Sequence, residues 1–309
     1  MVTRLAMFGL VVILVAACGS STPSAAPTTA AVASTTPTTV ATAAASIAPT
    51  IAPTRSPRPT ATPATATPCP GTDSTPNGKP ATDYRETQTQ WAGHVVFVKK
   101  RSISCVEGTW FQPKARCGFN SPDSVFVGIG MDGYASFNPT FDATNTNLMI
   151  GVETYCSNGG RINPRAWKWS EEKITDLGLE GIRVAEGDRV WARILYENDG
   201  YTIELVDLTN GTSASRQTGV PAAKRLTAEW VISTLLDCST ACKPAPLARF
   251  PELNFIDGAV SLDGGYRSTI RDDKWGDIRV TLEPKQTVLA RPGALLGDGA
   301  SFAITWVHA

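Results

Sequence analysis

Short runs rich in β-branched and aromatic residues recur through most of the 309-residue chain, and turn sequences separate several of them. Examples are WAGHVVFV at 91–98, SVFVGIGM at 124–131 and YTIELVDLT at 201–209. Asn198-Asp199-Gly200 and Asn210-Gly211 are typical of hairpin turns. No long stretch has the apolar period of a helix. The sequence therefore predicts an all-β fold, a sandwich of two curved antiparallel sheets with a concave and a convex face.

The N-terminus has the pattern of an export signal. Arg4 precedes an apolar run from Leu5 to Ala17, which is too short for an ordinary membrane-spanning helix. The small residues that end the run stand directly before Cys18, an arrangement that resembles a bacterial lipobox. This resemblance implies cleavage after residue 17, lipidation of the Cys18 thiol and a location on the outer face of a bacterial membrane. The alternative is an ordinary secretory signal followed by an incidental cysteine.

The next segment is built almost entirely from Thr, Pro, Ala and Ser. Such a composition has too little apolar bulk to offset the entropy of ordering the chain, and its prolines favour extended conformations. We therefore expect a signal peptide at 1–17, the lipid-anchor cysteine with a disordered stalk at 18–80, and one folded domain at 81–309.

Charge and residue usage narrow the chemistry. Lys and Arg together number 28, as do Asp and Glu, and no basic stripe stands out, which argues against a nucleic acid partner. The histidines are His94 and His308, and no G-x-S-x-G motif accompanies them, which argues against histidine-based catalysis. Cys238 and Cys242 have the spacing of a zinc finger, but no Cys/His pair follows them, and no calcium-loop spacing or cofactor motif is present. We expect a monomer without metal or cofactor, in which carboxylates and amides carry any chemistry.

Six cysteines remain besides Cys18, and an even number in an exported chain predicts disulfides. Six cysteines allow 15 pairings, so the sequence alone leaves the connectivity open. The pairing that we expect joins cysteines that are close in sequence: Cys105 with Cys117 and Cys238 with Cys242, which leaves Cys69 with Cys156.

A glutamate interrupts the predicted strand RLTAEWVIST at 225–234. Alternation would place Leu226, Ala228, Trp230 and Ile232 on one face and Glu229 on the other. Glutamate is depleted in strands and is almost never fully buried without a partner. The local sequence favours a solvated face for Glu229, and the alternative is a position on the floor of a cleft, where it would do acid/base work.

Segments along the whole predicted domain carry motifs in a recognisable order. Residues 228–231 read A-E-W-V, near to A-E-W-I, and residues 298–306 are close to D-G-S-S-F-T-V-T-W. Weaker matches occur at 90–93 (N-W-x-G), 108–113 (G-x-F-x-V-P), 126–130 (W-V-G-I-D-G), 148–153 (L-Q-x-G-V), 166–169 (A-W-Y-E-W) and 184–190 (a strand with a G-D turn). Taken together, the chain resembles the glutamic peptidases, also called eqolisins.

The resemblance implies a concanavalin A-like β-sandwich that cleaves unfolded or extended peptides at acid pH. In this family a glutamate acts as general base on a water and then protonates the leaving amine, while a glutamine holds the water and stabilises the oxyanion. Glu229 matches the position of the glutamate. The glutamine position is Met149, whose thioether is a weak acceptor and no donor. Because losing one oxyanion donor typically costs roughly 10²–10³ in rate, the chain is expected to bind peptides in its cleft and to hydrolyse them weakly or not at all.

Other positions also depart from the family motifs. Lys168 replaces the acid of A-W-Y-E-W, and its charge would keep a neighbouring Glu229 ionised. Gly130 replaces the aspartate of W-V-G-I-D-G, and the nearest acid is Asp132. The candidate substrate-binding residues are Trp91, Phe126, Asp132, Glu153, Trp167, Lys168 and Trp169.

Two alternatives stay open, so the sequence does not decide whether the chain is an enzyme. One is an active acid glutamic endopeptidase, in which Glu229 works with an unrecognised partner. The other is a non-catalytic surface lipoprotein that binds carbohydrate. Its sugar-stacking platform would consist of Trp91, Trp167, Trp169 and Trp230, although strand tryptophans at alternate positions more often pack in a core or a cleft wall.

Overall fold

The computed structural model describes most of the predicted domain and a short segment before it. The described residues are 65–74, 83–88, 90–99, 102–117, 123–134, 147–157, 160–161, 165–170, 173–176, 182–219, 223–234, 236–237 and 243–307. All of them belong to one compact unit, Pro59–Ala309. None of the described segments forms a helix long and apolar enough to cross a membrane.

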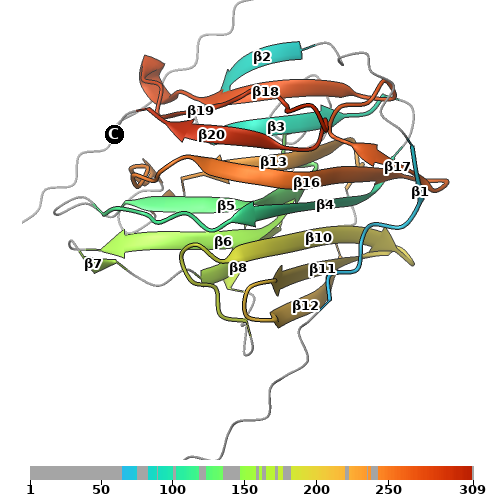
Figure 1. Ribbon diagram of the computed structural model, residues 1–309, viewed down its shortest axis with the longest axis horizontal. Helices are drawn as coiled ribbons and strands as arrows, with labels where there is room; N and C mark the ends of the chain where they lie inside the picture. Colours follow the sequence, from blue (N-terminus) through green and yellow to red (C-terminus); the bar gives the residue numbers. More distant parts are fainter. Residues whose placement is uncertain are drawn as a thin grey trace, which may run out of the picture. The chain divides into compact units, whose positions relative to one another are not determined.

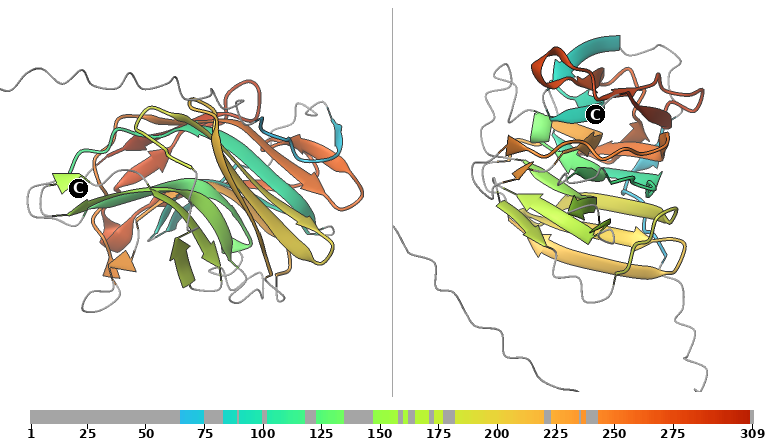
Figure 2. Two further views of the ribbon diagram at one scale, coloured as in Figure 1. Left: turned by 90° about the horizontal axis from the view of Figure 1, so that it is seen from below. Right: turned by 90° about the vertical axis from the view of Figure 1, so that its left-hand side faces the viewer.

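The described strands form two curved layers (Figures 1 and 2), which confirms the predicted concanavalin A-like sandwich. In the first sheet the pairing order is β2 (Asp83–Gln88), β18 (Gly276–Leu282), β3 (Trp91–Phe97), β13 (Thr227–Ser233), β5 (Ser124–Met131), β6 (Leu148–Ser157), β8 (Arg165–Ser170) and β9 (Lys173–Asp176), with β7 (Gly160–Arg161) beside β6. Only the β2–β18 pair of this sheet is parallel among the described strands.

In the second sheet the order is β19 (Ala290–Pro292), β20 (Phe302–Trp306), β16 (Leu253–Leu262), β4 (Ile103–Phe111), β10 (Arg189–Glu197), β11 (Gly200–Asp207) and β12 (Thr212–Thr218). β17 (Tyr266–Thr269) also pairs with β16, and β1 (Thr72–Asp73) runs parallel to β17. The pair Leu282–Ala290 joins the two sheets through β18 and β19. A small separate sheet pairs β14 (Leu236–Asp237) with β15 (Lys243–Pro244), and a 3-10 turn covers Pro284–Gln286.

Strand alternation divides the apolar side chains of the first sheet between two clusters. Ala228, Trp230 and Ile232 of β13 lie in the main core, which also contains side chains of β4, β10 and β16 from the second sheet. The intervening Val231 belongs to a smaller cluster on the opposite face of the first sheet. β13 therefore has the main core on one side and a second, smaller cluster of buried apolar side chains, together with Glu229, on the other.

The disulfides of the described residues are Cys69–Cys105 and Cys117–Cys156, so the expected pairs Cys105–Cys117 and Cys69–Cys156 are wrong. Cys105 lies in β4, and the six residues from there to the end of the strand already span roughly 20 Å at about 3.3 Å per residue. The Cα atoms of the bonded cysteines are 5.8 Å apart in Cys69–Cys105 and 5.4 Å apart in Cys117–Cys156. The extended strand thus carries the chain away from Cys105, and both cysteines pair with partners that are distant in sequence. Cys238 and Cys242 lie outside the described residues.

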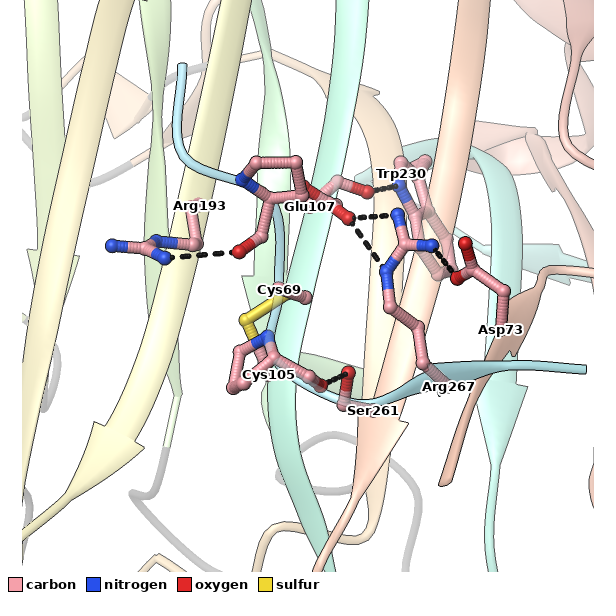
Figure 3. A network of polar contacts seen from close by, with 10 residues as sticks. Cys69, Asp73, Cys105, Glu107, Arg193, Trp230, Ser261 and Arg267 are labelled. Atoms are coloured by element: carbon pink, nitrogen blue, oxygen red, sulfur yellow. Dashed lines mark hydrogen bonds and ion pairs between the residues drawn. A yellow bond between two sulfur atoms is a disulfide. The ribbon is translucent and has the colours of Figure 1, made fainter. Parts of the chain in front are cut away.

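Residues 65–74, which we call the N-terminal strap, are fixed to the second sheet (Figure 3). Its contacts are the Cys69–Cys105 disulfide, a hydrogen bond from Arg193 to the Pro68 carbonyl at 3.2 Å, one from Ser261 Oγ to the Pro70 carbonyl at 2.7 Å, and the β1–β17 pairing. The strap precedes residue 81, where composition alone predicts that the folded domain begins.

A buried ion pair reinforces the strap. Glu107 of β4 is 3% exposed, and the Arg267 guanidinium donates to its Oε1 from Nε at 3.1 Å and also from Nη2. Arg267 also pairs with Asp73 of the strap, whose side chain is 76% exposed. One guanidinium therefore connects a buried carboxylate of the sheet to the N-terminal segment.

Candidate active site around Glu229

Glu229 lies at the centre of β13, paired with Val95 of β3 on one side and Gly130 of β5 on the other. Its side chain is on the face opposite Trp230, as alternation predicts. It is 0% exposed, so the solvated face that the local sequence favours is wrong. A local pattern gives the alternation of the strand but not what covers its outer face.

The two oxygens of the Glu229 carboxyl have different surroundings. Oε1 accepts hydrogen bonds from the Tyr134 backbone N–H at 2.9 Å and from Thr227 Oγ1 at 2.6 Å. Oε2 is buried and has no partner among the described residues. Burial raises the pKa of Glu229 to about 7, although the hydrogen bonds from Thr227 and Tyr134 oppose this shift and the nearby Asp132 adds to it. The carboxyl is thus oriented through one oxygen and has the other available.

Met149 lies across β5 from Glu229. Gly130 is the register partner of Glu229 on one side and of Met149 on the other. A methyl group on Gly130 would lie 2.6 Å from Glu229 Oε2 and 3.1 Å from Met149 Cγ. The two side chains therefore converge above the bare Gly130, and the structure brings together the two positions for which the sequence predicts catalytic roles.

A cluster of buried apolar side chains, which we call the outer cluster, lies around this pair. It consists of Trp91, Val95, Phe126, Tyr134, Met149, Val231, Ile278 and Val280. The Phe126 ring lies against the bare glycines of β5 and β6, where a methyl group on Gly128 or Gly151 would meet ring atoms at 2.7 and 2.6 Å. The predicted substrate-binding residues Trp91 and Phe126 are therefore on the same face of the sheet as Glu229.

Asp132 and Glu153, two further predicted site residues, are also buried. Asp132 is 0% exposed, and its carboxylate accepts the backbone N–H groups of Arg225 at 2.6 Å and Leu226 at 2.5 Å, so it holds the segment before β13. Burial raises the pKa of Asp132. Glu153 is buried in β6 as the register partner of Phe126, four residues from Met149 and therefore on the same face of the sheet as Glu229.

Strand β8 carries the other three candidates, Trp167, Lys168 and Trp169. Their backbones pair with Gly151, Ile150 and Met149 of β6 respectively. Their side chains lie outside the described residues, so an ion pair between Lys168 and Glu229 stays a prediction.

The proposed sugar-stacking platform does not form from the described tryptophans. Trp230 is 0% exposed in the main core, where its indole N–H donates to the Glu107 carbonyl at 2.8 Å, and Trp91 is 3% exposed. The interpretation of these residues as core or cleft-wall aromatics is the one that the structure supports.

Gln112 is not a substitute for the missing amide. Its Oε1 accepts from the Trp110 indole N–H at 3.0 Å, and its Nε2 donates to Thr154 Oγ1 at 3.3 Å. Trp110 belongs to the main core, on the other side of the first sheet from Glu229.

Sequence reasoning missed Asn147, which immediately precedes β6. Asn147 is 4% exposed, and neither polar atom of its amide has a hydrogen-bond partner among the described residues. The available signal was the strand period, because Asn147 stands two residues before Met149 and two-residue spacing repeats the same face.

Comparisons with known proteins agree with this geometry. The model of the Peptidase A4 family matches residues 89–291. No curated protein matches the chain at a significant level. Among solved structures, Scytalido-glutamic peptidase with a peptide-based transition state analog is similar over 71% of this chain and 99% of its own, at 20% identity and a TM-score of 0.57. SCP-B, an eqolisin in complex with the tripeptide Ala-Ile-His, is similar over the same shares, at 20% identity and a TM-score of 0.55.

Proposed function

Since the chain belongs to the Peptidase A4 family, the glutamic peptidases or eqolisins, we propose that it binds extended peptides on the outer cluster and hydrolyses them slowly through Glu229. The observation that carries the proposal is the state of the Glu229 carboxyl. It is fully buried, its pKa is raised to about 7, and only one of its oxygens is occupied among the described contacts. Perturbed carboxyls of this kind cluster at catalytic sites.

Glu229 has the properties of a group that both takes and returns a proton. Hydrogen bonds from Tyr134 and Thr227 fix Oε1, which leaves Oε2 to act on a water molecule. The ionised carboxylate removes a proton from the water as the water oxygen bonds to the peptide carbonyl carbon. The protonated Glu229 then passes this proton to the leaving nitrogen as the C–N bond breaks. A pKa of about 7 makes both transfers accessible near neutral pH.

Met149 makes this hydrolysis slow for two reasons. Its thioether cannot donate to an oxyanion, and loss of one such donor typically costs roughly 10²–10³ in rate. Its side chain also lies beside Oε2 of the fully buried Glu229, so water and peptide reach this oxygen only when the neighbouring side chains move. Methionine is unbranched and flexible enough to move in this way.

Peptides are the ligands that the comparisons support. Two structures with the same fold were solved with a peptide-based transition state analog and with a tripeptide. In this chain, Trp91 and Phe126 lie on the same face as Glu229 and are 3% and 5% exposed, so they would contact peptide side chains once the groups that cover them move.

We further propose that the protein is exported and anchored by a lipid on Cys18. The N-terminal basic and apolar pattern and the lipobox-like residues before Cys18 support this location. The disulfides Cys69–Cys105 and Cys117–Cys156 also support it, because such bonds persist in oxidising compartments.

The test is cleavage of a reduced and alkylated protein by the purified chain, followed by mass spectrometry from acidic to neutral pH. Wild type, Glu229→Gln and Met149→Gln are run side by side. We expect slow cleavage by wild type, none by Glu229→Gln, and an increase of roughly 10²-fold in Met149→Gln, which regains a donor. Equal cleavage by wild type and Glu229→Gln would contradict the proposal.

A further inference from the structure

Asn147 is a buried side-chain amide without a hydrogen-bond partner among the described residues. The residue is 4% exposed, and both Nδ2 and Oδ1 are without a partner among the described residues. Buried side-chain amides almost always have partners, and an exception indicates a site for a water, an ion or a ligand. Glu229 Oε2, on the same side of the first sheet, is unpaired as well.

The backbone at Gly133 and Tyr134 lies next to both groups. The Glu229 carboxyl accepts hydrogen bonds from backbone N–H groups at Gly133 and Tyr134. A methyl group on Gly133 would lie 2.7 Å from Asn147 Oδ1 and 2.6 Å from the Trp91 ring. The amide of Asn147, the carboxyl of Glu229 and the Trp91 ring therefore all lie next to the backbone at Gly133 and Tyr134.

We propose that Asn147 supplies the amide that Met149 lacks, by binding the attacking water and the oxyanion beside Glu229. This inference rests on the proposed function and names a second catalytic residue for it. A carboxamide has one acceptor oxygen and an NH2 donor. Oδ1 accepts one proton of the water while Glu229 Oε2 removes the other, and Nδ2 donates to the carbonyl oxygen as that oxygen becomes negative.

The position of Asn147 fits a partial replacement of the family glutamine. Two residues along a strand correspond to roughly 7 Å, so the amide of Asn147 approaches Glu229 from the side of Gly133 instead of from across Gly130. Asparagine is also one methylene shorter than glutamine. The same two groups, a donor and an acceptor, are thus available from a displaced position, which is consistent with slow hydrolysis.

The decisive variant is Asn147→Leu, which keeps the approximate shape of the side chain and removes both polar atoms. If Asn147 were only a buried amide, this change would leave kcat unaltered and would raise stability, because an unpaired polar group is removed. We expect instead that kcat falls at least tenfold with little change in KM, while thermal unfolding shows an unimpaired fold. The double variant Asn147→Leu/Met149→Gln should recover kcat, because a glutamine then supplies the amide.

Gly133→Ala provides a second test that leaves the Asn147 side chain in place. The added methyl group would lie 2.7 Å from Asn147 Oδ1 and 2.6 Å from the Trp91 ring, so both buried side chains must shift. We expect a several-fold loss in kcat that is smaller than the loss in Asn147→Leu.

The outcomes separate this inference from the proposed function. Cleavage that disappears in Glu229→Gln and persists at full kcat in Asn147→Leu would overturn the role of Asn147 and leave the function intact. No cleavage by wild type, or cleavage that is insensitive to Glu229→Gln, would overturn the function and this inference with it. Loss in both variants, with recovery in the double variant, supports both.

Discussion

Glu107 and Glu229 are two buried glutamates on neighbouring sheets, and they differ in whether a cation lies beside the carboxylate. Glu107, 3% exposed, accepts charged hydrogen bonds from the Arg267 guanidinium. Glu229, 0% exposed, accepts hydrogen bonds from neutral donors, which are backbone N–H groups and a hydroxyl, and its Oε2 is unpaired among the described residues. The first glutamate is neutralised by a cation, whereas the second is kept where its charged form is disfavoured.

The difference separates a structural carboxylate from a chemical one. The Glu107–Arg267 pair joins the N-terminal strap to the second sheet, and its two charges satisfy each other. Glu229 lacks such compensation, so its pKa rises to about 7, where it is able to exchange a proton. The contrast is tested by changing the ion-pair partners of Glu107 and the titrating carboxyl of Glu229.

The largest effect is expected from Arg267→Met. It leaves Glu107 buried without a cation, which typically costs about 3–5 kcal/mol of unfolding free energy. Urea unfolding of the disulfide-intact protein measures this loss. A change below about 1 kcal/mol would mean that Glu107 is not held by the ion pair.

Glu229→Gln should act on stability in the opposite direction, and only over part of the pH range. The pKa of Glu229 is raised from 4.5 to about 7 in the folded protein, so the folded state binds more protons than the unfolded state between these values. Wild-type stability contributed by this group is fully present below about pH 4.5 and is lost as pH rises to about 7, a loss of about 3 kcal/mol.

Glutamine does not titrate, so its stability does not fall over this pH range. Relative to wild type, the unfolding free energy of Glu229→Gln should therefore increase by up to about 3 kcal/mol as pH rises from 4.5 to 7. Urea unfolding of both proteins at several pH values measures the difference. A constant difference between pH 4.5 and pH 7 would contradict the raised pKa.

The pH dependence of hydrolysis should follow the ionisation of Glu229. Because the ionised carboxylate is the base, kcat/KM of wild type should fall about tenfold for each pH unit below about 7, which amounts to roughly 100-fold at pH 5. Initial rates on one mapped peptide check this limb. An optimum at strongly acidic pH, as the family resemblance implies, would show that Glu229 ionises well below 7 in the free enzyme.

The smallest effect is expected from Asp73→Ala, the matched control for Arg267→Met. Asp73 also pairs with Arg267, but its side chain is 76% exposed. Exposed ion pairs contribute about 0.2–1 kcal/mol, so the unfolding free energy should change by no more than that. A loss as large as that of Arg267→Met would mean that the Arg267–Asp73 pair, and not the Arg267–Glu107 pair, provides most of the stabilisation.

The sequence predicts what depends on local periodicity and on order along the chain. Alternation in β13 correctly predicts that Glu229 and Trp230 lie on opposite faces. The order of the motifs assigns Glu229 and Met149 to one site, and the structure places both side chains next to Gly130. The disulfide partners of Cys105 and Cys117 could not be predicted, because they are set by strands that pair at long range. For Asn147, the two-residue spacing to Met149 indicates the face of the sheet, but its burial against Gly133 depends on packing that the sequence does not show.

The most direct test of the central claim is the pKa of Glu229 itself, measured by NMR titration of side-chain carboxyl carbons in protein labelled with ¹³C-glutamate. The spectrum of Glu229→Gln identifies the signal by its disappearance. We predict that this carboxyl titrates close to pH 7 in the folded protein. A titration at or below the ordinary value of 4.5 would mean that Glu229 is a compensated carboxylate like Glu107, and would contradict its role as the exchanging acid and base.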